Sequence, residues 1–268
     1  MKAIFTGITA FAFGAIMTTA VLADGEPRSE SLKDTPVAAA GRYDWSGGYF
    51  GAHIGFGTGD SKLKETLPTI GPVLPLLGIP GALTSKHDVD GIIGGLQIGA
   101  RRQFGSVVLG VELAGTGSGI EGSTGNCLGI ETLAAGLGAP AGLIGSQCKT
   151  ELNWLSTLTG RAGIALDKFL VYGALGWSVA GVTNTNTISV ALPGVPIAFS
   201  GSQKDIMDGL VFGAGGEWAL MPGISLAVEY LHHDLQSKGS GLLLGGIVTT
   251  GTRDLELDTI TAKLNVKF

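Results

Sequence analysis

The chain ends in ELDTITAKLNVKF at 256–268, and from residue 260 onward apolar and polar side chains alternate without a break. The apolar positions are Ile260, Ala262, Leu264, Val266 and Phe268. The polar positions between them are Thr261, Lys263, Asn265 and Lys267. Because successive side chains of a β-strand point to opposite faces, this stretch predicts a strand with one apolar and one polar face.

Seven segments upstream alternate in a similar way, and they span 45–57, 88–101, 107–115, 150–165, 169–182, 204–220 and 224–235. A period of two repeated over segments of about ten residues is typical of transmembrane β-barrels. Within 150–165 the pattern places Leu152 and Trp154 on the outer face and Asn153 on the inner face. We therefore expect an all-β fold, an eight-stranded antiparallel up-and-down transmembrane β-barrel.

The connections between these segments alternate between short and long. Residues 103–106, 166–168 and 221–223 form short turns, whereas 58–87, 116–149, 183–203 and 236–252 form long loops. Outer-membrane barrels have short periplasmic turns and long extracellular loops, so both ends of the barrel are expected in the periplasm. A soluble β-sandwich or a lipocalin-like barrel is the alternative that this pattern leaves open.

The composition favours a membrane location over an aqueous one. Hydrophobic residues make up 44% of the chain, charged residues only 15%, and the mean hydropathy is +0.37. Yet residues 24–268 contain no continuous apolar run of the ~18 residues that a spanning helix needs. Since only helices and closed barrels satisfy every backbone group in lipid, we expect a barrel in the cell outer membrane, with outer-membrane lipids as its surroundings. The net charge of −5 and the lack of a basic run argue against nucleic acid as a partner.

The N-terminus has the features of an export signal. Lys2 is followed by an apolar stretch over 4–20, and Val21-Leu22-Ala23 offers small residues for cleavage after Ala23. We expect a signal peptide at 1–23, a periplasmic lead-in at 24–43 and the barrel at 44–268. An uncleaved N-terminal membrane anchor is the alternative.

The chain has two cysteines, Cys127 and Cys148. In the oxidising periplasm we expect them to form a disulfide, which would stabilise the protein by roughly 3 kcal/mol. Two free thiols are the alternative.

Seven charged residues fall on the predicted inner faces of the strands, and they are Arg101, Glu112, Arg161, Glu217, Glu229, Lys263 and Lys267. Facing lipid at mid-membrane, an Arg or Lys would cost roughly 2–4 kcal/mol, whereas inside the barrel the two signs can pair. An eight-stranded barrel is just wide enough for side chains to fill it, so we expect a packed polar network. A gated path for ions or solutes is the alternative interpretation.

Several motifs in the predicted strands together resemble those of a known family. They are WSGGYFG at 45–51, GGLQIG at 94–99, GVE at 110–112, TGRAG at 159–163, GAGGEWAL at 213–220 and LNVKF at 264–268. This set resembles the small outer-membrane immunogenic proteins of alphaproteobacteria, a branch of the opacity-porin, OmpA-like barrels. The resemblance implies an eight-stranded barrel with roles in envelope integrity and host contact, and no catalytic residues. It also implies that the terminal Phe268 is read by the barrel-assembly machinery.

The predicted loops are unusually apolar, notably at 70–80, 137–145, 192–199 and 242–248. Exposed apolar patches usually mark contacts with a partner or a membrane, although these loops could instead pack on one another. The sequence thus favours a structural and surface-interaction role, with a host or surface partner bound through the loops. A small porin is the alternative function.

An enzyme is a third possibility that the residues support poorly. His232, His233 and Asp234 stand at the outer end of segment 224–235, but no serine follows either histidine as the pattern of a lipid A deacylase requires. We interpret them as rim residues. A haem or metal site formed with His87 is a weaker idea, because one adjacent histidine pair is a poor signal. We therefore expect no enzymatic activity, no metal and no cofactor.

Overall fold

The structure is a computed structural model, and it describes residues 43–66, 82–127, 130–136, 138–140, 142–192, 195–240, 243–244, 247–248 and 250–268. The predicted signal peptide, all of the lead-in except Tyr43, and the apolar segment 70–80 lie outside these residues, so they stay predictions.

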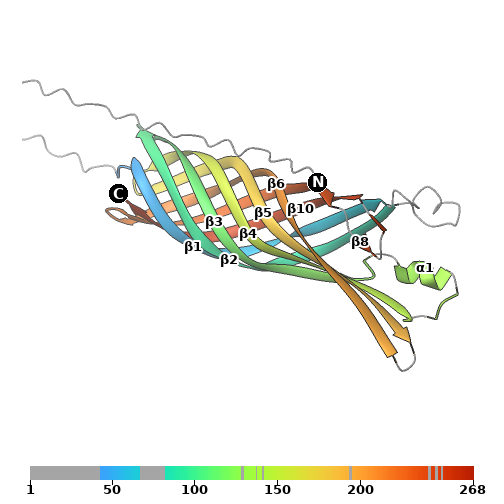
Figure 1. The fold of residues 1–268 in the computed structure, drawn as a ribbon. Coiled ribbons are helices and arrows are strands. Elements are labelled where there is room, and N and C mark those ends of the chain that lie inside the picture. The colour runs from blue at the N-terminus through green and yellow to red at the C-terminus, as the bar shows by residue number, and fades with distance from the viewer. Residues whose placement is uncertain are drawn as a thin grey trace, which may run out of the picture. The chain divides into compact units, whose positions relative to one another are not determined.

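Eight long strands close into one barrel (Figure 1). They are β1 (Gly47–Thr66), β2 (Ala82–Phe104), β3 (Val107–Gly125), β4 (Ile144–Leu166), β5 (Phe169–Leu192), β6 (Val195–Met221), β7 (Ile224–Ser240) and β10 (Thr250–Lys267). Each pairs antiparallel with its neighbours in the chain, and β1 pairs with β10 to close the ring. The remaining elements are α1 (Ile130–Gly136) and a small sheet of β8 (Leu243–Leu244) and β9 (Ile247–Val248). The predicted eight-stranded up-and-down barrel is confirmed.

The strands run much further than the sequence pattern indicated. The ranges 58–66, 82–87, 116–125, 144–149, 183–192 and 195–203 were expected to be loops, and they are strands. The apolar–polar alternation depends on lipid on one side, so it stops where a strand leaves the membrane. Backbone pairing has no such requirement and continues through polar residues such as Asn184 and Gln203.

A β-bulge changes the face of part of β4. The pairing of β4 with β5 shifts between Leu152 and Trp154. Because the extra residue interrupts the alternation, Leu152 is buried at 3% exposure while Asn153 is exposed. The prediction that Leu152 faces outward and Asn153 inward is therefore wrong, and that for Trp154 is confirmed.

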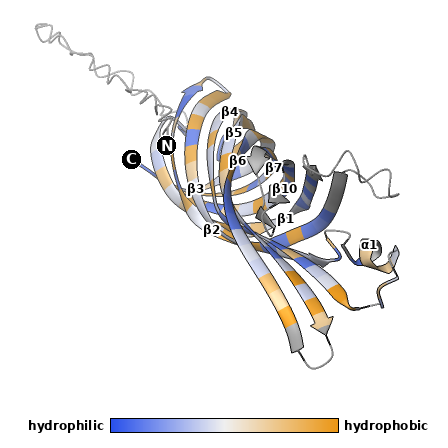
Figure 2. Ribbon diagram, turned by 45° about the vertical axis from the view of Figure 1, so that its right-hand side comes forward, coloured by the Kyte–Doolittle hydropathy of each residue, from blue (hydrophilic) through white to orange (hydrophobic). Residues whose placement is uncertain are grey.

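Large apolar side chains form the outer surface of the barrel wall. Phe50, Leu96, Leu175 and Phe212 are each at least half exposed, and Figure 2 shows apolar positions along the strands of the wall. Phe169, at the start of β5, and Trp218, near the end of β6, stack with their ring centroids 5.7 Å apart. Within the described ranges, no helix has the length and apolar character needed to cross a membrane.

Beyond the membrane the sheet divides into two parts. β6 pairs with β7 only as far as Asp208 and Gln236, and β2 pairs with β3 only as far as Asp90 and Glu121. Past these points β7, β10, β1 and β2 continue together, while β4, β5 and β6, with the end of β3, diverge from them (Figure 1). We call residues 144–152, 183–192 and 195–207 of these three strands the β4–β6 arm.

Candidate functional site

Four charged side chains form a closed network in the lumen. Oε1 of Glu112 accepts hydrogen bonds from Nη2 of Arg161 at 2.5 Å and from Nζ of Lys263 at 2.8 Å. Arg161 and Lys263 also both pair with Glu229. Each cation therefore bridges both carboxylates, and the four charges cancel. All four side chains are less than one-tenth exposed.

Two tyrosines complete this network. Tyr49 donates its phenol hydrogen to Oε2 of Glu112 at 2.8 Å, and Tyr172 donates to Oε2 of Glu229 at 2.9 Å. The guanidinium of Arg161 also lies over the Tyr172 ring, 4.8 Å from its centroid. Both oxygens of Glu112 are thus hydrogen-bonded, while Glu229 is hydrogen-bonded through Oε2 and paired with Lys263 through Oε1, so each buried carboxylate has a charged partner.

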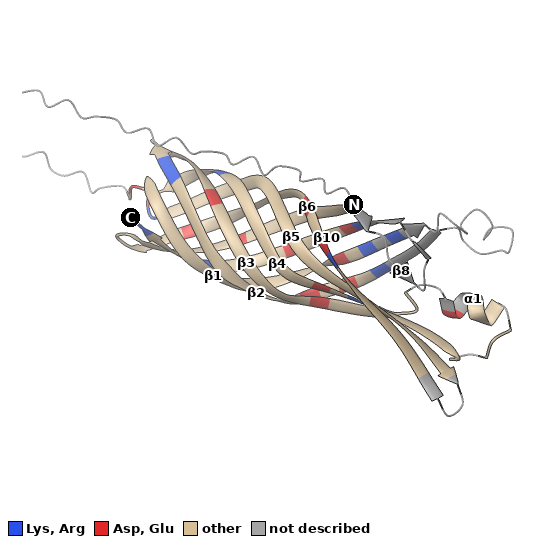
Figure 3. Cartoon of the chain, viewed as in Figure 1, with Lys and Arg blue, Asp and Glu red and all other residues tan. Residues whose placement is uncertain are grey.

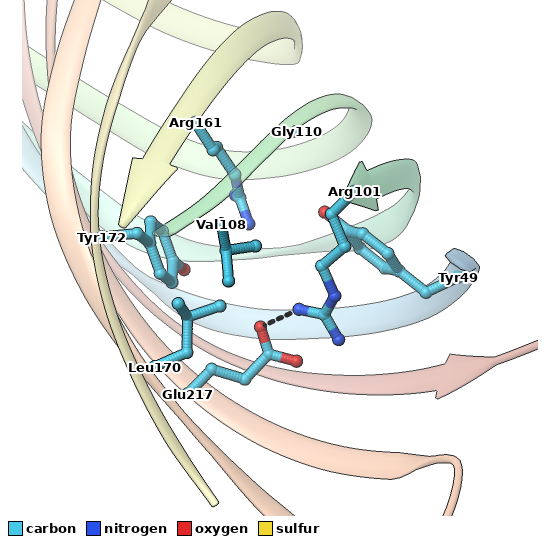
Figure 4. Close-up of a pocket in the computed structure, with 8 residues that line it drawn as sticks. All are labelled: Tyr49, Arg101, Val108, Gly110, Arg161, Leu170, Tyr172 and Glu217. Atoms are coloured by element: carbon cyan, nitrogen blue, oxygen red, sulfur yellow. Dashed lines mark hydrogen bonds and ion pairs between the residues drawn. The ribbon is translucent and has the colours of Figure 1, made fainter. Parts of the chain in front are cut away.

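A separate ion pair lies nearer the periplasmic end. Nη1 of Arg101 donates to Oε2 of Glu217 at 2.6 Å, as Figure 4 shows. The guanidinium lies between aromatic rings, 4.8 Å from the centroid of Trp45 and 4.7 Å from that of Tyr49. Asn265 donates to the other oxygen of Glu217 at 3.2 Å. This arrangement removes the guanidinium from water while giving it an ion pair and two aromatic rings.

Of the seven charged residues that the sequence placed inside, the structure brings six into the lumen. Lys267 is the exception, because its Nζ donates to the backbone oxygen of Asp44 at 2.7 Å at the rim. Lys267 also stands last in β10, where the strand ends. The other six residues are three cations and three anions, so their charges balance.

Two histidines form a polar layer above the charged network. His53 contacts Oε1 of Gln97 at 2.7 Å and Oγ1 of Thr116 at 3.0 Å. His233 contacts Oγ of Ser178 at 2.9 Å and is 1% exposed. The interpretation of His233 as a rim residue is therefore wrong, since it points into the lumen.

His232, in contrast, faces outward. Its Nδ1 lies 2.7 Å from Oδ1 of Asp258, which also accepts the phenol hydrogen of Tyr230 at 2.7 Å. The ring of Phe212 lies beside it, with centroids 5.1 Å apart. This cluster stands where the apolar outer surface gives way to charged residues, as expected of the rim.

An apolar layer lies in the lumen above the histidines. Eleven buried side chains pack together there, and they are Val89, Ile93, Ile120, Leu152, Leu155, Ala180, Val182, Met207, Leu235, Leu255 and Leu257. The polar network that the sequence predicts therefore occupies only part of the lumen. The sequence showed Leu255 and Leu257 on the same face as Lys263, but nothing marked them as a separate layer.

A second apolar cluster fills the periplasmic end, and it consists of Trp45, Val108, Ala165, Leu170, Tyr172 and Ala219 with Tyr43 against it. Trp45 is fully buried, and its indole N–H donates to the backbone oxygen of Asp167 at 3.0 Å. Trp45 comes before β1, so the residues leading into the barrel fold back under it. The charged network thus lies between two apolar layers.

Above the upper apolar layer, polar groups line the extracellular mouth. Nε2 of His87 lies 2.9 Å from Oγ1 of Thr150, which donates to Oδ1 of Asn184 at 2.9 Å. Burial lowers the pKa of the His87 imidazole, because it disfavours the charged form. Arg253 of β10 pairs with Asp205 of β6 at 2.6 Å and so joins the two parts of the divided sheet.

Charged residues on the outer surface gather at this same end (Figure 3). Lys149 lies 2.8 Å from Glu121 and 2.9 Å from Glu151. Hydrogen bonds to these two carboxylates raise the pKa of Lys149 to about 12. Such a surface belongs outside the hydrocarbon region.

The two cysteines form the predicted disulfide, with Cα atoms 5.8 Å apart. Ile188 of β5 packs against it. The bridge ties the end of β3 to the start of β4 and encloses α1 between them. It is therefore part of the extracellular end of the protein.

The three histidines that the sequence offers as possible ligands lie apart. His232 faces outward, His233 is in the lumen, and His87 is bonded to Thr150 at the mouth. In the part of the chain that the structure describes, no three side chains of His, Cys, Asp or Glu gather as metal ligands would.

The closed strand ring, its apolar outer face and its internal ion pairs define an integral β-barrel of the outer membrane. The chain belongs to the family of the outer membrane protein beta-barrel domain, whose model matches residues 35–268. Its localisation in the cell outer membrane and the resemblance drawn from the strand motifs are thereby confirmed.

Among curated proteins, the chain is similar to the 31 kDa outer-membrane immunogenic proteins of Brucella melitensis and Brucella suis. Each is 27% identical over 260 residues, which cover 95% of this chain and 96% of the relative. Solved structures with a similar fold include the outer membrane protease OmpT of Escherichia coli, at 11% identity and a TM-score of 0.45, covering 83% of this chain and 97% of that one. OprG of Pseudomonas aeruginosa matches at 18% identity and a TM-score of 0.39, covering 83% and 98%.

Proposed function

We propose that this protein is a non-conducting and non-catalytic barrel that supports the outer membrane and presents an extracellular surface for binding. The observation that carries the proposal is the upper apolar layer, which spans the lumen between the histidines and the mouth. An ion crossing this layer would find no polar group to replace its hydration shell, and such constrictions exclude water.

The rest of the lumen also argues against a pore. The cavity between His53, Thr157 and Lys263 has a volume of about 20 Å³. That is room for one or two water molecules. Below it, the bridged quartet of Glu112, Arg161, Glu229 and Lys263 fills the cross-section with paired charges. A solute would have to break several buried ion pairs to pass.

The contacts of His233 support a role without catalysis. Ser178 and His233 have the separation of a nucleophile and its base, at 2.9 Å. However, the second ring nitrogen contacts the hydroxyl of Thr259 at 3.2 Å, where a catalytic triad has a carboxylate. Ser178 is also fully buried, so a substrate could not reach it.

Single-channel recording of the folded protein in planar bilayers tests this proposal. We expect no reproducible conductance steps from the native chain. The double variant Met207→Ser and Leu257→Ser replaces two members of the apolar layer by small polar residues, and it should leak more than the native chain. Regular conductance steps from the native protein would refute the proposal and support a small porin instead.

A further inference from the structure

The outermost part of β6 has an unpaired edge. β6 pairs with β5 from Val195, opposite Leu192, to Trp218, opposite Phe169. Its pairing with β7 starts only at Asp208. Among the described residues, no strand therefore pairs with the other edge of residues 195–207. An edge of this kind presents a row of backbone donors and acceptors that can bind another chain.

The residues whose backbone groups point to this open edge can be identified. Ala219 donates its N–H to the backbone oxygen of Lys168, on the β5 side. The pairing of β6 with β5 shows no shift, so odd-numbered residues of β6 direct their N–H groups toward β5. Even-numbered residues direct theirs to the open edge, and these are Ala198, Ser200, Ser202, Lys204 and Ile206. Pro196 has no N–H and ends the row.

This edge lacks most of the features that protect exposed strands. Natural edge strands are shielded by charges, prolines or bulges. Here Pro196 and Lys204 flank the open edge, and residues 197–203 between them carry no charge. Phe199 is 65% exposed and Ile197 is 37% exposed on the same face. An added strand would find both backbone partners and an apolar side chain to pack on.

We propose that residues 197–206 of β6 form a docking edge for an extended segment of another protein, which would bind as an additional strand of the β4–β6 arm. This inference rests on the proposed surface-binding function and names its partner class. The bound segment would have apolar residues at alternate positions, to contact Phe199 and Ile197, and no proline facing β6.

A second copy of this chain in the same membrane is a poor occupant. β6 is one continuous strand from the barrel wall to its tip, Val195–Met221. Two β6 edges that pair antiparallel are related by a twofold axis that reverses the strand direction. The second barrel would then point away from the first, whereas two copies in one bilayer point the same way. We therefore take a different polypeptide as the partner.

A fluorescent peptide of alternating threonine and valine, with one lysine at each end, is the probe that tests this docking edge. Its binding to the folded full chain in detergent micelles is followed by fluorescence anisotropy. The double variant Ser200→Pro and Ser202→Pro removes two open-edge N–H groups and leaves the bonds to β5 in place. The matched control, Ser200→Ala and Ser202→Ala, keeps both N–H groups. Heat-modifiable gel migration confirms that all three proteins fold.

We expect the peptide to bind the native chain and the alanine control alike, and to bind the proline variant about tenfold or more weakly, since two hydrogen bonds are lost. Hydrogen exchange at Ala198, Ser200 and Ser202 should be fast in the free protein and slow with peptide. Failure of the peptide to bind, or equal binding by all three proteins, would overturn the proposal. So would slow exchange without peptide, which would mean that this chain or a second copy already covers the edge. None of these outcomes bears on conductance, so the closed lumen is judged separately.

Discussion

Nη2 of Arg161 lies 2.5 Å from Oε1 of Glu112 on the neighbouring strand β3, inside the barrel. The same nitrogen contacts Glu229 on β7, so one guanidinium connects opposite walls of the lumen. This relationship explains how strands with charged inner faces can form a stable barrel in lipid.

Replacing Arg161 by methionine should destabilise the protein strongly. The change leaves Glu112 and Glu229 with Lys263 as their shared cation, and removing one partner from a buried ion pair costs about 3–5 kcal/mol. Urea unfolding in lipid vesicles, followed by tryptophan fluorescence, measures the change. Lys267→Met at the half-buried rim is the control, for which we expect about 0–1 kcal/mol. Equal losses of unfolding free energy in both variants would show that the lumen network contributes no more to stability than Lys267 does at the rim.

Adding Glu229→Gln to the Arg161→Met variant should restore part of the lost stability. The lumen quartet would then hold one anion, Glu112, and one cation, Lys263, so its charges would balance again. Coupling between residues in one such network is typically about 0.5–3 kcal/mol. The same unfolding assay on both single variants and the double variant gives the coupling energy. Strictly additive losses would contradict the network.

Asp234→Asn should stabilise the extracellular end slightly. Asp234 stands opposite Glu256, Glu256 opposite Asp60, and Asp60 opposite Asp88 on the outward face of four neighbouring strands. Like charges directly opposite one another are destabilising, by roughly 0.2–1 kcal/mol per pair. The gain should shrink in high salt, which screens exposed charges. Glu256→Gln is the comparison, since it also loses the ion pair with Lys62. A loss of stability in Asp234→Asn would refute the claim that these four carboxylates repel one another.

Reducing the disulfide should loosen the extracellular end but leave the barrel folded. Cys127 and Cys148 join β3 to β4 beyond the membrane, far from the lumen network. We expect faster proteolysis between the two cysteines in reductant, with unchanged heat-modifiable migration of the barrel. The Cys127→Ser and Cys148→Ser double variant should behave as the reduced protein does. Collapse of the barrel on reduction would contradict a local role.

The parts of the fold that the sequence predicted are those in which lipid imposes a pattern. Residues 260–265 and 107–113 alternate because one face of each strand is in hydrocarbon, and both stretches are strands with the expected faces. Beyond the membrane neither face has to be apolar, so the sequence of the outer halves of β5 and β6 could not be distinguished from that of loops. The bulge near Asn153 leaves no trace in composition, since its effect is only to shift the alternation by one residue.

The sequence predicted which residues belong to the candidate site, but not how these residues are arranged. Alternation shows that Glu112, Arg161 and Glu229 point inward, but their relative heights depend on the register of strands that are distant in sequence. The upper apolar layer was missed for a related reason. In the sequence, a single inward leucine such as Leu257 looks like a break in the apolar–polar alternation. Only the alignment of the strands shows that it belongs to an apolar layer.

Two tryptophans at the same end of the barrel provide the most direct test of the central claim that lipid surrounds a filled cylinder. Trp218 stacks on Phe169, at the start of β5, and is 48% exposed, whereas Trp45 bonds to Asp167 in the adjacent turn and is fully buried. The measurement is fluorescence quenching by brominated phospholipids, in variants that keep one tryptophan and carry phenylalanine at the other three positions. We predict strong quenching of Trp218 and almost none of Trp45. Equal quenching of the two, or a Trp218 untouched by brominated lipid, would contradict the account.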